Sequence, residues 1–518
     1  MVQQIKEGRA VPEGRRKAVP TQGIENSGGG KAIPVNKQMR QLELNFGTAE
    51  CDTSQDVLAV GAEVFHQRET STCAVPKPGV QEEHVSSATM EAVVEKLGEA
   101  FLKVASNKGA PGPDRQTVDT VRANLKDLLL KLSDALMRGT YKPGEIRRVW
   151  ITKVGGFRGL GIPNVVDRMV YEAIRMVLEP LYEPMFHEES HGFRPKRSCH
   201  TAIKACRKHV DDGKEWVVDI DLESFFDRVN HQRLMARLRE RVKDRRLLKL
   251  IWAGLKAKVV MPNGVVVGTE EGVPQGSPLS PLLSNIVLDE LDHELHRRGH
   301  CFVRYADDCN IYVGSERAGQ RVMSSVRRFI ERRLRLKVNE RKSTVARTSE
   351  RHFLGFHLKR NAEDGEVEVL LSTRSKERIQ NKVRDLTPRN WGQSLKACIA
   401  RINMYAEGWM GFFGICTAEV EITLKQTDSH IRRRLRAIQL KHWKRKRTIV
   451  KRLVQLGVKF KTASRSVYGG HKSSWALSYQ SAVHRGLRNI FFAELGLKSL
   501  AEMWSVSHPK LVARVQME

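Results

Sequence analysis

Long apolar stretches are missing from this sequence, and so are paired cysteines. No run approaches the roughly 20 apolar residues that a bilayer-spanning helix needs, which argues against a membrane protein. The first 20 residues mix acidic and basic side chains without an apolar core, so we expect no secretory signal. The eight cysteines are scattered and form no Cys-x-x-Cys pair. This pattern excludes a disulfide framework and a zinc knuckle, and it favours reduced thiols in the cytoplasm.

Acidic residues are scarce in the C-terminal part of the chain, although the formal net charge of the whole is +30. Residues 1–87 are balanced, with 10 Lys/Arg and 11 Asp/Glu, whereas residues 428–518 hold 20 Lys/Arg and 4 Asp/Glu. So dense a basic field predicts a polyanionic partner such as nucleic acid, because each neutralised phosphate releases condensed counterions. The alternative is the solvated surface of a basic protein. It would explain a small excess of basic residues, but not a segment with so few acidic ones.

The length of 518 residues allows about two to four domains, and 40% hydrophobic with 29% charged residues is typical of globular proteins. Residues 1–87 lack periodicity and contain many breakers, so we expect a mobile, largely disordered leader. From about residue 88 the pattern indicates an α+β body, and after residue 374 it is helical. The periodicity predicts helices over 118–137, 165–181, 231–256, 281–297 and 317–334, strands within 146–163, 216–221, 336–338 and 353–371, and hairpins over 259–267 and 301–313.

Two adjacent acids stand between short apolar strands in the sequence Tyr305-Ala306-Asp307-Asp308. Nucleotide transfer needs little covalent help from protein side chains, but it uses two Mg²⁺ ions about 4 Å apart. Mg²⁺ prefers carboxylate oxygens on a rigid backbone, and two neighbouring anions are costly unless a cation lies beside them. On their own, the four residues fit an ordinary acidic β-turn equally well, because Asp is common in turns.

Further acids lie at the end of an expected strand, where Asp219 and Asp221 precede Phe226. The order Asp-x-x-x-x-Phe, then Gln-Gly-Ser-Pro-Leu-Ser-Pro from Gln275, then Tyr-Ala-Asp-Asp resembles reverse transcriptases, and among them those encoded by group II introns. Further blocks that resemble this family lie at 108–114, 147–163, 190–198, 336–343 and 353–356. The resemblance covers about residues 95–504, and its combined motifs are highly specific.

The resemblance implies a right-hand polymerase with fingers, palm and thumb that copies RNA into DNA from dNTPs with two Mg²⁺ ions. Asp221, Asp307 and Asp308 would then be the catalytic and metal-binding residues. Asp219 is the competing choice, but the family places an aromatic residue five positions after the catalytic acid, and Asp221 meets this spacing with Phe226. Phe226 would act as a steric gate whose ring occupies the space of a ribose 2′-hydroxyl, which favours dNTPs.

The remaining substrate contacts are also implied by the resemblance. Lys153 and Arg158 look like the fingers cations that clamp the triphosphate, where the transition state needs compensating charge. Gln275 would line the nascent base pair, and Lys342 would approach the leaving pyrophosphate. The loop between Lys153 and Arg158 is one residue shorter than the family pattern, and Thr152 replaces the usual proline. This departure puts the clamp in doubt, but not the three acids.

The basic tail resembles the maturase (X) domain that follows the thumb in group II intron proteins. Apolar residues at helical intervals would anchor its helices while the cations face outward. By analogy this region binds structured intron RNA, which proteins recognise by shape, phosphates and stacking. The candidate RNA-binding residues are Arg432, Arg433, Arg434, Trp443, Lys444 and Arg445. A basic thumb that grips only the template–primer duplex is the open alternative.

The resemblance divides the chain into the leader 1–87, fingers and palm 88–360, a thumb 361–425, and a basic helical maturase and DNA-binding region 426–518. It implies an RNA-directed DNA polymerase encoded by a group II intron, which also binds its intron RNA to assist splicing and retrohoming. The expected partners are that intron RNA, an RNA template and a DNA primer or target, with no membrane and with the oligomeric state left open. No C-terminal HNH endonuclease is recognisable, so second-strand cleavage is not expected.

Other functions fit parts of the sequence. A domesticated reverse transcriptase in phage defence or CRISPR adaptation would keep the polymerase without necessarily keeping the RNA-binding tail. A non-enzymatic splicing factor would be expected to lose one of the three acids, and all three are present. Residues 187–191 satisfy the His-Glu-x-x-His pattern of zinc proteases, but Pro184 and Gly192 flank it and favour a turn over the helix that this chemistry needs.

Overall fold

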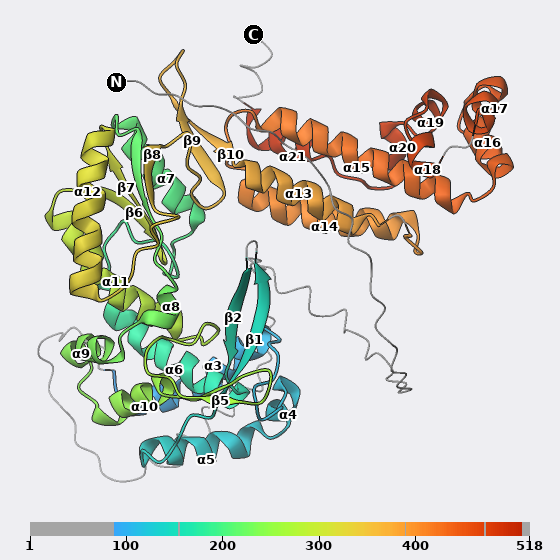
Figure 1. Ribbon diagram of the computed structural model, residues 1–518. Coiled ribbons are helices and arrows are strands. Elements are labelled where there is room, and N and C mark those ends of the chain that lie inside the picture. Colours follow the sequence, from blue (N-terminus) through green and yellow to red (C-terminus); the bar gives the residue numbers. More distant parts are fainter. Residues whose placement is uncertain (1–87, 154–155, 389, 471–472, 510–518) are drawn as a thin grey trace, which may run out of the picture. The chain divides into compact units, whose positions relative to one another are not determined.

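The computed structural model describes residues 88–153, 156–388, 390–470 and 473–509 (Figure 1). Within these ranges the chain combines helices and strands, as the sequence predicts for an α+β protein. The leader expected over residues 1–87 lies outside the described residues, and so does most of the loop expected near residue 155.

A four-stranded antiparallel sheet carries the predicted hairpin of 301–313. Its strands are β3 (Trp216–Ile220), β6 (Cys301–Tyr305), β7 (Asp308–Val313) and β8 (Thr344–Arg347), and their order is β6-β7-β3-β8. Strands β3, β6 and β7 are rich in buried apolar residues because both faces of this part of the sheet are covered, whereas β8 at the edge is only half-buried.

The other strands form a second sheet and a separate hairpin. The second sheet has the order β2-β1-β4-β5, and within it β2 pairs along its whole length with residues 147–153 of β1. Gly264 in the turn between β4 and β5 has a φ of +84°, which explains the Asn-Gly signal there. These strands are β1 (Ile146–Lys153), β2 (Gly156–Ile162), β4 (Val259–Val260), β5 (Val266–Val267), β9 (Phe356–Arg360) and β10 (Val367–Leu371).

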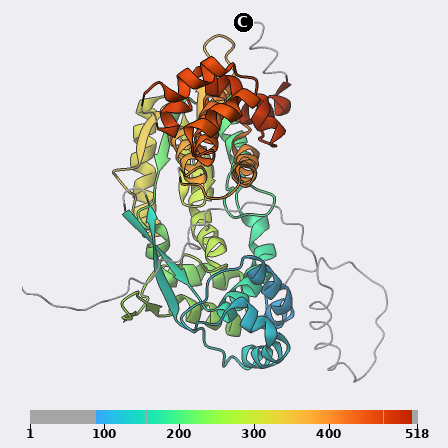
Figure 2. The ribbon, with the colours of Figure 1, turned by 90° about the vertical axis from the view of Figure 1, so that its right-hand side faces the viewer.

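Helices account for most of the remaining described chain. Those before residue 330 are α2 (Met90–Glu95), α3 (Leu97–Ser106), α4 (Val118–Ala123), α5 (Leu125–Met137), α6 (Val165–Tyr182), α7 (Cys199–Asp211), α8 (Phe225–Arg228), α9 (His231–Arg241), α10 (Arg245–Leu255), α11 (Ser280–Arg297) and α12 (Glu316–Phe329). The C-terminal part, orange to red in Figure 2, is all helical after β10, as predicted. It consists of α13 (Thr373–Leu386), α14 (Leu395–Phe413), α15 (Val420–His442), α16 (Lys446–Gln455), α17 (Phe460–Tyr468), α18 (Ser474–Leu477), α19 (Ser481–Gly486), α20 (Asn489–Glu494) and α21 (Leu500–Ser507).

The two faces of the β6-β7-β3-β8 sheet belong to two different hydrophobic cores. Val218 and Ile311 lie in the first core, to which α6, α11 and α12 contribute. Val217 and Tyr312 form the neighbouring pair of the same two strands, and their side chains lie in the second core. That core contains side chains of α7, of the β9–β10 hairpin and of the C-terminal helices. The sheet therefore forms a wall between two apolar interiors, and α12 lies along its first face (Figure 1).

Three of the expected elements are wrong in detail. The helix expected over 118–137 is interrupted at Asn124, which separates α4 from α5. The helix expected over 231–256 is two helices, because the Asp244 side chain accepts the amides of Arg246 and Leu247 and caps a new helix there. The Asp244 carboxylate also accepts a hydrogen bond from the Met90 amide, which ties the start of α10 to the start of α2. No strand forms at 336–338 in the described chain, where Val338 makes only an isolated bridge, and the strand that pairs with β3 is β8. The apolar side chains of 336–338 enter the first core without ladder pairing.

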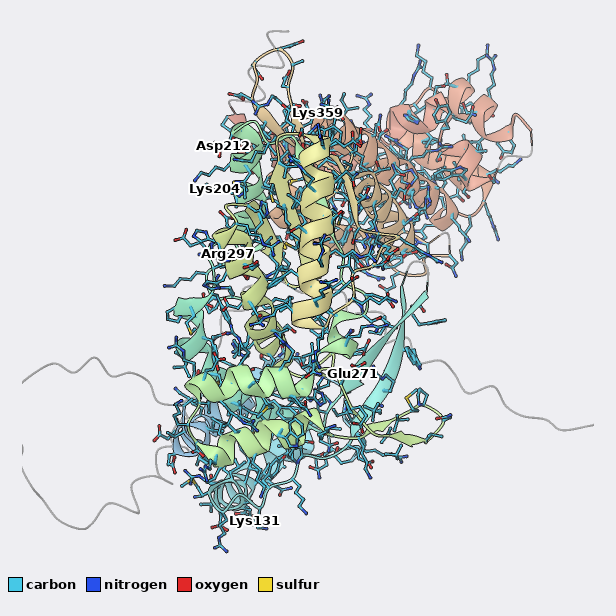
Figure 3. All side chains as sticks on the ribbon, turned by 60° about the vertical axis from the view of Figure 1, so that its left-hand side comes forward. Lys131, Lys204, Asp212, Glu271, Arg297 and Lys359 are labelled. Atoms are coloured by element: carbon cyan, nitrogen blue, oxygen red, sulfur yellow. The ribbon has the colours of Figure 1, made fainter. Side chains whose placement is uncertain are left out.

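Basic side chains also lie on the surface outside the C-terminal helices. Lys131 of α5, Lys204 of α7 and Lys359 of β9 are exposed, and Figure 3 shows them extending away from the ribbon. Among the described residues, no helix is both long enough and apolar enough to cross a bilayer.

Candidate active site

The turn between β6 and β7 is a two-residue connection. Tyr305 pairs with Asp308 as the last rung of the hairpin, so Ala306 and Asp307 form the tip. Ala306 has a φ of +57°, the positive value that tight two-residue hairpin turns require. Burial and the neighbouring Cys199 thiol raise the pKa of Tyr305, so its hydroxyl stays protonated. The tip is thus narrow, with Asp307 and Asp308 as consecutive residues on it.

Asp221 lies at the same end of the sheet. Ile220 is paired with Cys309 in the antiparallel ladder between β3 and β7, and one further step of this register sets Asp221 opposite Asp308. The backbone of Asp221 is held by the segment before β8: its amide donates to Ser343 Oγ at 3.0 Å, and its carbonyl accepts the amide of Asn339 at 2.8 Å. The three acids predicted from the sequence are therefore at neighbouring backbone positions.

The side chain of Asp221 is engaged by Lys342. The Lys342 ammonium lies 3.3 Å from each carboxylate oxygen of Asp221. As the side chains stand, no group of three or more His, Cys, Asp or Glu residues in the described parts of the chain is drawn together tightly enough to enclose a metal. The donor set nevertheless fits Mg²⁺, because three carboxylates on two adjacent strand ends supply hard oxygen ligands from rigid backbone.

Asp219, the competing acid, lies within the sheet and not at its end. It is paired with Asn310 on one side and with Thr344 on the other. Its carboxylate makes an ion pair with Arg351. Burial raises the pKa of Asp219, and the arginine opposes this effect. The carboxylate of Asp219 is thus already compensated by a fixed cation, whereas Asp221 lies beside the turn.

Backbone contacts fix the positions of Phe226 and Gln275. The amide of Val273 donates to the Phe226 carbonyl at 2.6 Å, and the Gln275 carbonyl accepts the amide of Gly161 in β2 at 2.7 Å. Gly276 has a φ of +119°, and a Cβ there would collide with the Gly161 carbonyl oxygen. The segment after Gly272 therefore joins the short helix that carries Phe226 to the β1–β2 hairpin.

The two expected clamp cations belong to this β1–β2 hairpin. Arg158 is exposed and pairs with Ile151, while Lys153 is the last residue of β1 and pairs with Gly156. They lie near the end of the hairpin where β1 passes into β2, two ladder positions apart. Because β2 also contacts the Gln275 segment, the hairpin is physically linked to the part of the chain that carries Phe226.

The sequence did not reveal the polar support beneath the turn. Arg304, directly before Tyr305, is completely buried and forms an ion pair with the equally buried Asp292 of α11. It also donates to Ser190, in a loop that passes beside the hairpin. An arginine inside the apolar strand Phe302-Val303-Arg304 is a signal that a carboxylate must lie nearby, but the sequence alone does not identify which one. The His-Glu-x-x-His residues belong to this loop and are not helical, as predicted.

The expected RNA-binding residues have different environments. Arg433 stacks on Trp475, with its guanidinium carbon 4.0 Å from the ring centroid, and Arg434 donates to the backbone and side chain of Thr387. Both arginines are half-buried, as is Arg432. Trp443 packs against the second core, whereas the two residues that follow it, Lys444 and Arg445, are exposed at the corner between α15 and α16.

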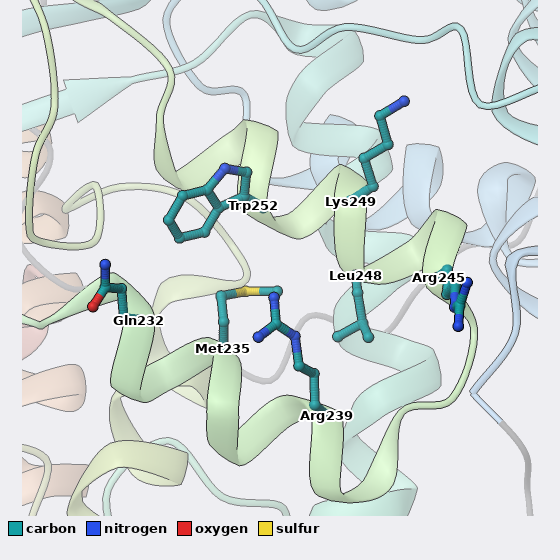
Figure 4. Close-up of a pocket in the computed structure, with 7 residues that line it drawn as sticks. All are labelled: Gln232, Met235, Arg239, Arg245, Leu248, Lys249 and Trp252. Atoms are coloured by element: carbon teal, nitrogen blue, oxygen red, sulfur yellow. The ribbon is translucent and has the colours of Figure 1, made fainter.

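A concave surface elsewhere on the molecule contains none of the predicted site residues. It lies between α9 and α10, and Figure 4 shows Met235, Leu248 and Trp252 between the two helices. Arg239 and Arg245 are exposed around it. This groove is therefore separate from the residues that the sequence predicts for the active site.

Comparison with known proteins agrees with the geometry. The family described as Reverse transcriptase (RNA-dependent DNA polymerase) matches residues 142–358, and Group II intron, maturase-specific domain matches residues 376–455. Protein YkfC of Escherichia coli (strain K12) is 34% identical over 368 residues, which cover 63% of this chain and 96% of YkfC. Group II intron-encoded protein LtrA of Lactococcus lactis subsp. cremoris is 30% identical over 366 residues, which cover 55% of this chain and 60% of LtrA.

A solved structure, the Partial Cas6-RT-Cas1--Cas2 complex, is 23% identical, with a TM-score of 0.32 over 50% of this chain and 45% of that chain. So low a TM-score supports no conclusion.

The matched domains identify an RNA-directed DNA polymerase, a class that uses a divalent metal and dNTPs. The chain belongs to the family of group II intron-encoded reverse transcriptases that carry a maturase domain. Its maturase-specific domain implies binding to intron RNA. The domesticated and non-enzymatic alternatives are not favoured by these matches.

Proposed function

We propose that this chain copies RNA into DNA with two Mg²⁺ ions held by Asp221, Asp307 and Asp308. The observation that carries this proposal is the β3–β7 register, which sets Asp221 opposite Asp308 and next to the tip residue Asp307. When bound, the two ions would supply the charge that activates the primer 3′-hydroxyl and stabilises the leaving pyrophosphate.

The side chains around the acids suit the handling of a nucleotide. Lys342, which lies against Asp221, carries a cation to the place where pyrophosphate charge develops. Phe226, fixed by the Val273 amide, would exclude a ribose 2′-hydroxyl, and Gln275 would line the nascent pair. Lys153 and Arg158, in the β1–β2 hairpin, would bind the triphosphate.

The order of the elements supports a right-hand polymerase. We assign fingers and palm to residues 88–360, the thumb to 361–425 and the maturase and DNA-binding region to 426–518, with residues 1–87 as a leader. In this assignment the β6-β7-β3-β8 sheet is the palm sheet, and the β1–β2 hairpin belongs to the fingers. The free cysteines of the described chain suit a reducing compartment such as the cytoplasm.

The basic C-terminal helices would bind the intron RNA, and through it assist splicing and retrohoming. Exposed Lys444 and Arg445 at the α15–α16 corner are the candidates best placed to contact phosphates. Arg433 stacks on Trp475 and Arg434 donates to the Thr387 carbonyl, so these two arginines would act mainly by fixing the position of α15.

Primer extension on an RNA template with dNTPs tests the carboxylate assignment. Asp307→Ala should lower the extension rate by at least roughly 100-fold, because a metal ligand is lost. Asp212→Ala, at an exposed acid just after α7 (Figure 3), serves as the matched control and should extend like the wild type. Equal rates for wild type and Asp307→Ala would exclude this site as the catalytic centre.

A nucleotide-selection assay tests the gate separately. Phe226→Ala should lower the preference for dNTPs over rNTPs by at least roughly tenfold, because the ring no longer blocks a 2′-hydroxyl. An unchanged preference would remove Phe226 from the sugar-binding position without affecting the metal assignment.

A further inference from the structure

Arg304 uses all of its hydrogen-bond donors beneath the carboxylate turn. Its Nε and Nη2 donate to the two oxygens of Asp292 at 2.7 and 2.6 Å. Its Nη1 donates to Asn285 Oδ1 at 3.0 Å and to the carbonyl oxygen of Ala306 at 2.8 Å, and Nη2 also donates to Ser190 Oγ at 2.7 Å. A guanidinium has five N–H groups in one plane, and here all five have acceptors.

The bond to the Ala306 carbonyl acts directly on the metal-binding turn. That carbonyl belongs to the peptide unit that joins Ala306 to Asp307, so Arg304 fixes the plane from which the Asp307 side chain projects. Because the Arg304 and Asp292 side chains are fully buried, no water competes with this bond. An ion pair that served only to fold the protein would not need to reach the tip of the hairpin.

The neighbouring loop braces the turn from a second direction. The Arg304 amide donates to the Glu189 carbonyl at 2.8 Å, and the His191 amide donates to the Arg304 carbonyl at 2.9 Å, so this loop lies along the edge of β6. Asn285 Nδ2 donates to the carbonyl of Gly192 at 2.9 Å. Gly192 itself lies against the backbone of Ala306, where a Cβ would have no room.

We propose that Arg304 and Asn285 are positioning residues that set the affinity of the active site for its divalent metal, by holding the Ala306–Asp307 peptide at a fixed place relative to Asp221. This inference rests on the proposed function, because it takes Asp307 and Asp221 as metal ligands. Both positioning residues are fully buried, so neither is accessible to substrate. Their effect passes through the backbone of the turn, and it should appear in metal binding more than in nucleic-acid binding.

The test compares two buried arginines. Arg304→Lys keeps a cation beside Asp292 but lacks the flat set of donors that reaches Ala306 and Asn285 at once. Arg194→Lys is the matched control, because Arg194 is also buried and binds the Glu183 carboxylate and three backbone carbonyls. These carbonyls belong to Glu183, His187 and Ser190, so Arg194 contacts the neighbouring loop but not the turn. Asn285→Ala is the second test variant, since it leaves the Arg304–Asp292 pair intact.

Binding of Mn²⁺, followed by electron paramagnetic resonance without turnover, is the direct readout. We expect Arg304→Lys and Asn285→Ala to weaken Mn²⁺ binding at least fivefold and to raise the Mg²⁺ concentration for half-maximal extension by a similar factor. Their template–primer Kd should stay within twofold of the wild type. Arg194→Lys should bind Mn²⁺ within twofold of the wild type, even if its melting temperature falls.

The outcomes separate this inference from the proposed function. If Asp307→Ala binds Mn²⁺ and extends primers like the wild type, the proposed function fails. If Asp307→Ala is inactive while both test variants bind Mn²⁺ normally, only the positioning role fails. An equal loss in Arg194→Lys would also overturn that role, because an arginine that contacts only the neighbouring loop would then have the same effect as one bound to the turn. Should Arg304→Lys not fold, Asn285→Ala decides by the same criteria.

Discussion

The contact between Gly192 and the carboxylate turn gives the sharpest test of how strictly the turn must be placed. A Cβ on Gly192 would lie 3.0 Å from the Tyr305 carbonyl carbon and 3.1 Å from Ala306 Cα, and closer still to the Ala306 amide nitrogen. Gly192 itself is not in the left-handed region, so alanine suits its backbone and the clash is the main effect of Gly192→Ala. To reach ordinary contact distances, the turn and the loop must separate by roughly 1 Å.

A shift of that size should be costly for catalysis and moderate for stability. A displacement of about 1 Å at reacting groups can lower a rate about 100-fold, whereas overpacking costs about 1–3 kcal/mol of unfolding free energy. We therefore expect single-turnover primer extension by Gly192→Ala to fall by about two orders of magnitude. Thermal or denaturant unfolding should show a protein that is still folded.

The control is a glycine with space around it. Gly98, in α3, has nothing near the position of a Cβ, so Gly98→Ala should be neutral or stabilising by about 0.5–1 kcal/mol and should extend primers normally. A Gly192→Ala protein that loses stability but extends within threefold of the wild type would refute the reasoning. In that case the turn could move without harm to the chemistry.

Three further outcomes follow from contacts elsewhere. Arg434→Ala should lower the unfolding free energy by about 1–3 kcal/mol in denaturant titration, because the Thr387 carbonyl loses its donor. Arg445→Ala should leave stability unchanged and lower the salt slope of RNA binding by about one. Equal effects of the two variants on stability would contradict this division. Burial raises the pKa of Asp289 to about 6 from 3.8, so between these pH values the folded protein binds a proton that the unfolded protein has lost. The unfolding free energy should therefore fall by up to about 3 kcal/mol as the pH rises through this window. Asp289→Asn should flatten this pH dependence in unfolding measurements, and an unchanged slope would assign it to other groups. Phe193 is 51% exposed and has a φ of +58°, and its ring centroid lies 6.4 Å from that of Tyr305. Phe193→Gly should therefore relieve backbone strain without loss of stability. If the Phe193 ring stacks on a base, the same variant should weaken template–primer binding by about 1–3 kcal/mol, and unchanged binding would exclude that contact.

The sequence was most informative where structure depends on neighbours in the chain. The hairpin of 301–313 and the Asn263-Gly264 turn follow from alternation and turn residues, which are local properties. The order of the acids followed from family spacing. The break at Asp244 was missed because periodicity continues through it, and only the cap contacts reveal two helices.

The sequence was least informative where partners are far apart in the chain. Arg304 and Ser190 are separated by 114 positions, and nothing local in the chain identifies that contact. The cations of the tail were counted correctly, but a count does not distinguish Arg434, engaged by Thr387, from the exposed Arg445. Long-range polar contacts are chosen by the folded arrangement, so they are visible only once the elements are in place.

The sheet that separates two apolar interiors has a consequence for how this protein can evolve. Its second face shares a core with the C-terminal helices, so a gene that lost those helices would expose apolar side chains around the polymerase sheet. Selection on RNA binding and selection on DNA synthesis therefore act on one inherited folding unit. A descendant that kept only the polymerase would first have to acquire polar substitutions, or a new covering segment, on the second face of the β6-β7-β3-β8 sheet.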